Sequence, residues 1–446
     1  MIAGIEHRGF LIQECSLPGE TRADNVFPAL ADGIQVSNRR FLLVYSTRGW
    51  RGVDDNLSIV YQLRDGAYDG RVVKEGLLTA SIDDWNPLGN GTPVVKAHSN
   101  ARAFGVPKGA VIQGRKPPNE NVFAVKWLRV GRHVDPQTGF MLGVPETQAW
   151  LAAATTAAEW VQFRLNDDED DIEILQPVEM LRQKGFETSQ AFCEADVTFM
   201  SSAYGRPVPF DAAGAQWIEY AGFDGGRVAP LKYVFNADRG LYEWREMGPL
   251  TGGDLMEPSV TRHRDRWVVA ARISVPGEKK VKWPPAWAAT DDPFGEPLHL
   301  FKPSGPKSRA PICMFTCPDG TIRLLGNAPD LSPYRHARNP LYCWNIDPAS
   351  DFAAAKARVI FDGKAAGVPI RDQSGVIVDN GRLLPHAGGD TQYLLHRVRP
   401  GATNNPERAG VPVNDRDKSG AGVYYATVRY SEAFPGEWAF NSPKGR

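Results

Sequence analysis

The sequence lacks the features that mark membrane, nucleic-acid-binding and disulfide-stabilised proteins. No run of about eighteen apolar residues exists, so nothing is predicted to span a membrane. The formal net charge is −1 over 446 residues, so no overall field attracts nucleic acid or an anionic membrane surface. Five cysteines are an odd number in a long chain, which argues against a disulfide framework. We therefore expect no nucleic-acid partner, no membrane partner and no cofactor.

A secretion leader is also missing from the start of the sequence. The N-terminal stretch MIAGIEHRGFLIQECSLPG contains neither an apolar core segment nor a small-residue cleavage site. The sequence therefore leaves open a cytoplasmic protein and a secreted one whose leader is not part of it. Oligomeric state cannot be read from the sequence.

Short apolar segments separated by turn residues are what the chain does contain. Gly (44) and Pro (35) are abundant together, which suits many short strands joined by turns. Asp65-Gly66, Asp319-Gly320 and Asn380-Gly381 each lie between apolar runs and predict hairpin turns. Similar hairpins recur at steps of roughly fifty to sixty residues in the second half, near the period of a propeller blade. Six such blades would account for most of the chain, so we predict one all-β, six-bladed β-propeller over residues 1–446.

The middle of the chain departs from this pattern. An Ala/Thr-rich stretch of fair helical propensity begins at Glu146, and the acidic run Asp167 to Asp171 follows it. The acidic run lacks the spaced ligands and the glycine of an EF-hand, so we interpret it as a solvated loop. Residues 146–195 are predicted to form a short helical or loop insertion between blades.

Two groups of side chains outside the repeat are interpreted from their surroundings. Cys313 and Cys317 have the wrong spacing for a zinc knuckle and are read as small core residues. Trp283 and Trp287 lie in a Pro-rich segment poorly suited to a strand, so we expect them on a long loop over the site or at a subunit contact.

The stretch from Met256 to Ser274 predicts a hairpin that turns at Arg264-Asp265. Glu257 begins its first strand and Arg272 ends its second, so the two side chains are expected side by side. An arginine fork can hold an anionic substrate while a neighbouring carboxylate assists catalysis. The alternative interpretation is an ordinary surface ion pair.

Four segments together resemble the sialidase superfamily of six-bladed β-propellers. The segment TRGWRGVDDNLSIVYQLRDG is similar to the one that holds the family's acid/base aspartate, which would be Asp55, with Arg48 and Arg51 on the same loop. The segments EPSV and AAR are similar to those with the glutamate that supports the nucleophile and the arginine that follows it. HARNPLYCWNIDPASDF resembles the segment with the last arginine of the carboxylate-binding triad, here Arg338.

The fourth segment, RDQSGVIVDNGRLL, departs from the family. Asp372 and Gln373 stand where the resemblance implies a tyrosine nucleophile. The arginine of the F/Y-R-I-P motif is also missing, because the comparable stretch reads NVFPAL. The resemblance implies a propeller that acts on a glycan, with Asp55, Glu257 and Asp372 as candidate catalytic carboxylates. Arg272 and Arg338 would clamp an anionic substituent, and the two departures suggest an acidic or neutral sugar other than sialic acid.

Two other functions remain open at this stage. A polysaccharide lyase acting on a uronate would need a base, and His98 or His386 could supply it from Gly-rich segments that look like loops. A non-catalytic propeller that binds glycans or another protein is the third hypothesis, and the missing tyrosine favours it. For either enzyme the expected partner is an oligosaccharide or polysaccharide.

Overall fold

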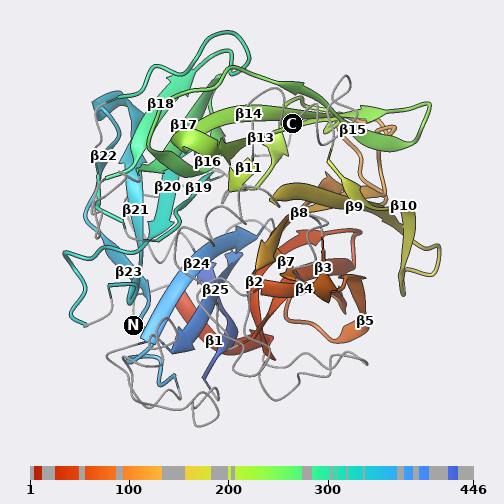
Figure 1. Cartoon of the computed structure of the whole chain (residues 1–446), viewed down its shortest axis with the longest axis horizontal. Helices are drawn as coiled ribbons and strands as arrows, with labels where there is room; N and C mark the ends of the chain where they lie inside the picture. Colours follow the sequence, from red (N-terminus) through yellow and green to blue (C-terminus); the bar gives the residue numbers. More distant parts are fainter. Residues whose placement is uncertain are drawn as a thin grey trace.

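The computed structural model forms six antiparallel sheets arranged around a central axis (Figure 1). It describes residues 5–12, 26–49, 56–86, 94–132, 156–181, 199–201, 206–273, 284–301, 305–308, 310–317, 320–334, 337–368, 376–384, 391–400 and 420–429. The chain is thus an all-β, six-bladed β-propeller, as predicted. Within the described ranges no α-helix is present, and none of their elements is a long apolar helix that could cross a membrane.

The blades follow one another along the chain, and the last one is closed by the first strand. Blade 1 comprises β2 (Val26–Gln35), β3 (Arg40–Gly49), β4 (Asn56–Asp65) and β5 (Val72–Thr79). Blade 2 comprises β6 (Ile82–Trp85), β7 (Val94–Val106), β8 (Val122–Arg132), β9 (Ala157–Leu165) and β10 (Ile172–Met180). Blade 3 comprises β11 (Phe199–Ser201), β12 (Val208–Pro209), β13 (Gln216–Phe223), β14 (Arg227–Asn236) and β15 (Leu241–Met247).

The second half of the chain forms the other three blades. Blade 4 comprises β16 (Leu255–His263), β17 (Arg266–Ile273) and β18 (Ala286–Thr290). Blade 5 comprises β19 (Cys313–Thr316), β20 (Ile322–Gly326), β21 (Leu341–Asp347), β22 (Ala353–Ala354) and β23 (Arg358–Phe361). Blade 6 comprises β24 (Val376–Leu384), β25 (Thr391–Pro400), β26 (Gly422–Arg429) and β1 (Ile5–Ile12). Because β1 pairs with β26, the blade that closes the ring contains strands from both ends of the chain.

The inner strands of neighbouring blades run parallel to one another. Ser37, just after β2, forms a parallel bridge with Lys108, just after β7. Between β16 and β19, the Met314 amide donates to Ser259 Oγ over 3.0 Å, and the amide two residues further on, at Thr316, donates to Thr261 Oγ1 over 2.9 Å. The propeller therefore has two distinct ends. We call the end where the inner strands begin the amino end, and the end where they finish the carboxyl end.

The core lies between the blades. In β3 the four consecutive residues Leu42 to Tyr45 are all fully buried, because a blade packs on a neighbour through each of its two faces. Between blades 2 and 3, the Phe104 ring lies 5.5 Å from Trp217 and 5.2 Å from Tyr233. These contacts explain why the strands read as continuous apolar runs instead of alternating patterns.

Most of the predicted hairpins are confirmed, and one is wrong. Asp65-Gly66 and Gly320 lie between paired strands, as expected. Asn380-Gly381 does not turn the chain: both residues lie inside β24, at a bulge between Asp379 and Arg382. A Cβ on Gly381 would lie 3.1 Å from the Leu341 side chain, so close approach to β21 is what this glycine permits.

Three further expectations are settled by the packing. Residues 157–180, assigned above to an insertion, form β9 and β10 of blade 2, and the acidic run is the turn between them. Trp287 is not on a loop: it is fully buried in β18 and stacks on Phe352 at 5.1 Å. Cys313 and Cys317 are buried core residues, as expected, whereas Trp283 lies outside the described residues.

Candidate functional site

Glu257 and Arg272 form an ion pair at the amino end of blade 4. Arg272 lies opposite Met256 in the β16–β17 ladder, and a bulge between Met256 and Ser259 follows. Within the bulge Glu257 has φ +52°, a left-handed conformation that side chains rarely adopt and that is over-represented at functional sites. Arg272 Nη1 donates to Glu257 Oε2 over 2.6 Å, and both side chains are partly exposed. The predicted pairing of these two residues in the hairpin is confirmed.

Arg338 lies at the same end, between β20 and β21. Its carbonyl accepts a 2.7 Å hydrogen bond from the amide of Val378, near the start of β24. Its Nη1 donates to Asp379 Oδ2 over 2.8 Å, and the side chain is a quarter exposed. Arg338 therefore joins blades 5 and 6 at the amino end of the propeller.

Asp379 is a fully buried carboxylate shared by several arginines. Arg397 donates to both of its oxygens over 2.8 Å, in addition to the bond from Arg338. Burial favours the neutral acid, but the guanidinium groups of Arg397, Arg338 and Arg399 outweigh it and hold the pKa of Asp379 well below its usual range. Because this carboxylate stays ionised, it fixes the orientation of Arg338.

Several predicted residues lie outside the described part of the chain. They are Arg51, Asp55, Asp372, Gln373 and His386. For Arg48 only the backbone is described, and it pairs with Phe27 and Asn56 at the amino-end edge of blade 1. The catalytic and binding roles of these six residues stay predictions.

His98 was expected on a loop, and that placement is wrong. It lies within β7, its side chain is fully buried, and its Nε2 is 3.6 Å from Glu159 Oε2. Because the His98 ring has no exposed surface, it cannot reach a substrate proton in this conformation. His98 therefore cannot serve as the base of a lyase in this structure.

The surroundings of His98 contain a charged cluster that the sequence analysis missed. Glu159 Oε1 lies 3.2 Å from Lys96 Nζ and 3.5 Å from Arg129 Nη1, at the amino end of blade 2. The Arg129 guanidinium also lies over the Trp85 ring, 5.1 Å from its centre. Trp85, Arg129 and Glu159 come from three different strands of blade 2, and Lys96 and His98 both come from β7. In β7 these two residues alternate with apolar residues, and that alternation is the only sign of the cluster in the local sequence.

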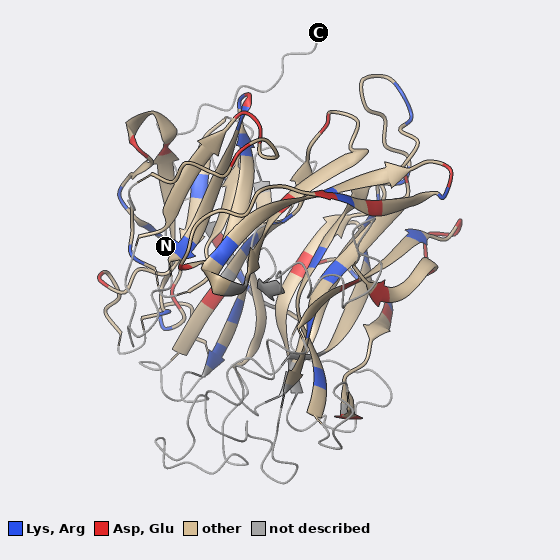
Figure 2. Cartoon of the chain, turned by 45° about the horizontal axis from the view of Figure 1, so that its top comes forward, with Lys and Arg blue, Asp and Glu red and all other residues tan. Residues whose placement is uncertain are grey.

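The amino end thus combines carboxylates with an excess of cationic side chains. Arg272, Arg338, Lys96 and Arg129 are all partly exposed there. Over the part of the chain that the structure describes, acidic and basic residues are interspersed (Figure 2). In the ranges that the structure describes, no group of three or more His, Cys, Asp or Glu side chains is placed to hold a metal ion. Guanidinium and ammonium groups of this kind can bind anions, and a neighbouring carboxyl group can transfer a proton.

The fold is that of the sialidases. Trypanosoma rangeli sialidase superposes with a TM-score of 0.58 at 10% identity, over 97% of this chain and 60% of that one. The Hadza microbial sialidase Hz136 gives 0.53 at 10% identity, over 91% and 66%. A Dyadobacter fermentans protein of unknown function gives 0.55 at 11% identity, over 96% of this chain and 99% of its own. No protein-family model and no curated protein sequence matches the chain.

The chain therefore has a sialidase-like six-bladed β-propeller fold. It spans about three fifths of the length of the Trypanosoma rangeli enzyme. Identities of 10–11% establish the architecture alone, and the chemistry has to be argued from the residues of this chain.

Proposed function

We propose that the protein is a glycoside hydrolase that acts on an acidic, carboxylate-bearing sugar at the amino end of the propeller. The observation that carries this proposal is the Glu257–Arg272 pair, held by a bulge in a left-handed backbone conformation. Glycoside hydrolysis needs a carboxyl group beside the sugar, and recognition of an acidic sugar needs guanidinium groups close by. Glu257 supplies the first, and Arg272 and Arg338 supply the second.

The roles follow from the contacts. Arg272 orients the Glu257 carboxylate through their 2.6 Å hydrogen bond, so Glu257 acts as a base or supports a nucleophile. Arg338, oriented by the ionised Asp379, binds the sugar carboxylate. Asp55 is proposed as the general acid and Asp372 as the nucleophile or the group that positions water; both roles come from the resemblance of their segments.

The test compares the wild type with Glu257→Gln on a panel of acidic and neutral oligosaccharides. Reducing ends and the ultraviolet absorbance of unsaturated products are followed together. We expect reducing ends without new absorbance, and a loss of about 10²–10⁴-fold in kcat/KM for the variant. Glu173→Gln is the matched control, because Glu173 forms a 2.6 Å pair with Arg164 at the exposed edge strand of blade 2. Its activity should stay at the wild-type level.

Three results would contradict the proposal. Equal activity in wild type and Glu257→Gln would remove the carboxylate from the reaction. New ultraviolet absorbance would identify a lyase instead. Glycan binding without turnover of any substrate in the panel would identify a binding protein.

A further inference from the structure

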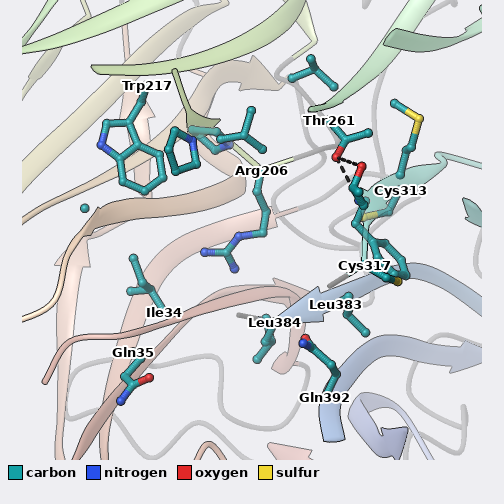
Figure 3. A pocket seen from close by; sticks show the side chains of 18 of the residues that line it. Ile34, Gln35, Arg206, Trp217, Thr261, Cys313, Cys317, Leu383, Leu384 and Gln392 are labelled. Atoms are coloured by element: carbon teal, nitrogen blue, oxygen red, sulfur yellow. Dashed lines mark hydrogen bonds between the residues drawn. The ribbon is translucent and has the colours of Figure 1, made fainter. Parts of the chain in front are cut away.

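A cavity of about 610 Å³ lies at the carboxyl end of the propeller, away from the proposed sugar site. Figure 3 shows the side chains that line it. Its walls include residues near the carboxyl ends of inner strands, among them Gln35 of β2, Thr261 of β16 and Leu384 of β24. Glu257, by contrast, stands near the start of β16. The two sites therefore share strands but open at opposite ends of the axis.

The lining of the cavity is mainly apolar. Its apolar members include Ile34, Trp217, Met314, Phe315 and Leu383. The volume is within the range of about 300–1,000 Å³ typical of small-molecule sites, and such sites combine apolar walls with a few polar groups. A small organic molecule, not a polysaccharide, fits these walls.

Arg206 is the one charged residue among the described lining residues, and its charge is already balanced. Its Nη1 donates to Asp32 Oδ1 over 2.7 Å and also to the Gly33 carbonyl. Its Nη2 donates to the Ala103 carbonyl over 3.1 Å, and Asp32 has no exposed surface. Because this ion pair is neutral overall, the cavity offers no net charge to attract an anion or a cation.

The other polar side chains in the cavity wall differ in whether they already form hydrogen bonds to the protein. The Thr261 hydroxyl donates to Thr316 Oγ1 over 2.9 Å, and the Gln35 amide donates to the Ser37 carbonyl over 3.0 Å. The side-chain amide of Gln392 makes no hydrogen bond to another described residue, and in Figure 3 it points from β25 toward Arg206. It can both donate and accept a hydrogen bond.

We infer that this cavity binds a neutral, largely apolar small molecule that hydrogen-bonds to the Gln392 amide. The site is independent of the sugar chemistry proposed for the amino end. Its ligand class follows from the balanced Arg206–Asp32 pair, which disfavours charged molecules, and from the Gln392 amide, which can fix the orientation of a neutral ligand.

The first test uses the neutral dye Nile red, which has an apolar ring system and a carbonyl acceptor. Its fluorescence should rise with the wild-type protein and saturate at one dye per chain. Gln392→Trp fills the cavity and should raise the dissociation constant at least tenfold. Gln392→Leu keeps the volume but removes the amide, and should raise it by about 2- to 10-fold, the value of one hydrogen bond.

Two controls isolate the cavity. Ile174→Trp adds the same ring at an exposed position of β10 and should leave binding unchanged. Glu257→Gln should also leave dye binding unchanged, which separates this inference from the proposed hydrolase activity. Saturable binding with equal affinity in wild type and folded Gln392→Trp would overturn the inference, as would the absence of saturable binding to the wild type.

A second measurement on the wild type covers the case in which Gln392→Trp does not fold. Cys313 and Cys317 line the cavity, whereas Cys343 is buried elsewhere in the same core. Nile red should slow the alkylation of Cys313 and Cys317 by a small maleimide relative to Cys343, as mapped by mass spectrometry. Unchanged relative rates would place the dye outside the cavity and overturn the inference.

Discussion

Replacing Asp379 with Asn tests whether the buried carboxylate organises the amino end of blade 6. Asp379 is fully buried and receives hydrogen bonds from Arg397 and Arg338. Removing one partner of a buried ion pair typically costs about 3–5 kcal/mol, because the other charge stays buried without compensation. We expect Asp379→Asn to lower the free energy of unfolding by about 3 kcal/mol or more at pH 7. Urea unfolding followed by tryptophan fluorescence measures this change.

The depressed pKa of Asp379 also predicts the direction in which stability changes with pH. The pKa of Asp379 is depressed in the folded protein, and an unfolded aspartate titrates near 3.9. The carboxylate therefore contributes its full stability above about pH 5 and loses it at lower pH, because the unfolded chain takes up a proton that the folded chain does not. Between pH 5 and pH 3 the gap between wild type and Asp379→Asn should shrink by about 1 kcal/mol.

The control for this experiment is a surface pair. Asp291 is 81% exposed and accepts a 3.0 Å hydrogen bond from Arg266, so Asp291→Asn should change stability by no more than about 0.5 kcal/mol. A gap between wild type and Asp379→Asn that is constant or widens toward pH 3 would refute the assigned direction of the pKa shift. A cost no larger than that of Asp291→Asn would refute the role of the buried carboxylate.

Two further predictions concern the packing between blades. Lys126 of β8 and Glu219 of β13 form a fully buried ion pair. Lys126→Met should therefore lower the free energy of unfolding by about 3–5 kcal/mol, and the Lys126→Met/Glu219→Gln double variant should be more stable than Lys126→Met alone. Equal or lower stability of the double variant in urea unfolding would contradict this. Trp287→Ala should lower the free energy of unfolding by about 3–5 kcal/mol, because the ring is fully buried and stacks on Phe352. A wild-type urea midpoint together with impaired glycan turnover would instead indicate that Trp287 lies on a loop over the sugar site.

The fold could be predicted because each blade is built from local hairpins. Asp65-Gly66 was identified correctly from two residues and their apolar flanks, since a tight turn needs a left-handed residue, and Gly66 has φ +79°. Asn380-Gly381 carries the same local signal but lies within a strand. There the glycine accommodates Leu341, a contact between blades that nothing in the neighbouring sequence encodes.

In blade 2, local helical propensity predicts the wrong structure. Residues 157–165 have an Ala-rich beginning with fair helical propensity, yet they form β9 against β8. Burial overrides propensity here: Trp160, Val161 and Phe163 each lose nearly all their exposed surface in the core between blades. The pattern in the sequence cannot distinguish this from a helix without knowledge of what packs on both faces.

At the candidate sites too, contacts within one hairpin can be predicted from the sequence, whereas contacts between blades cannot. Glu257 and Arg272 are fifteen positions apart in one hairpin, so ladder geometry alone predicts their contact. Arg338 and Asp379 are separated by 41 positions, and Asp32 and Arg206 by 174. Arg338 and Asp379 join the neighbouring blades 5 and 6, whereas Asp32 of blade 1 and Arg206, just before β12 of blade 3, come from blades that are not adjacent. The closed ring brings both pairs together, and their spacing in the sequence carries no periodic signal.

The two proposed ligand sites use some of the same strands at opposite ends of the propeller. Glu257 and Thr261 stand four residues apart on β16, which corresponds to roughly 13 Å along a strand. Glu257 meets Arg272 at the amino end, whereas Thr261 hydrogen-bonds to Thr316 in the wall of the apolar cavity. Hydrogen bonds from two β19 amides to the Ser259 and Thr261 hydroxyls hold β16 against β19 at the carboxyl end, so we expect a substitution at Glu257 to leave the backbone at Thr261 in place. Sugar turnover and dye binding should therefore respond separately to Glu257→Gln and Gln392→Trp, and loss of both properties in either variant would show that the two ends are coupled.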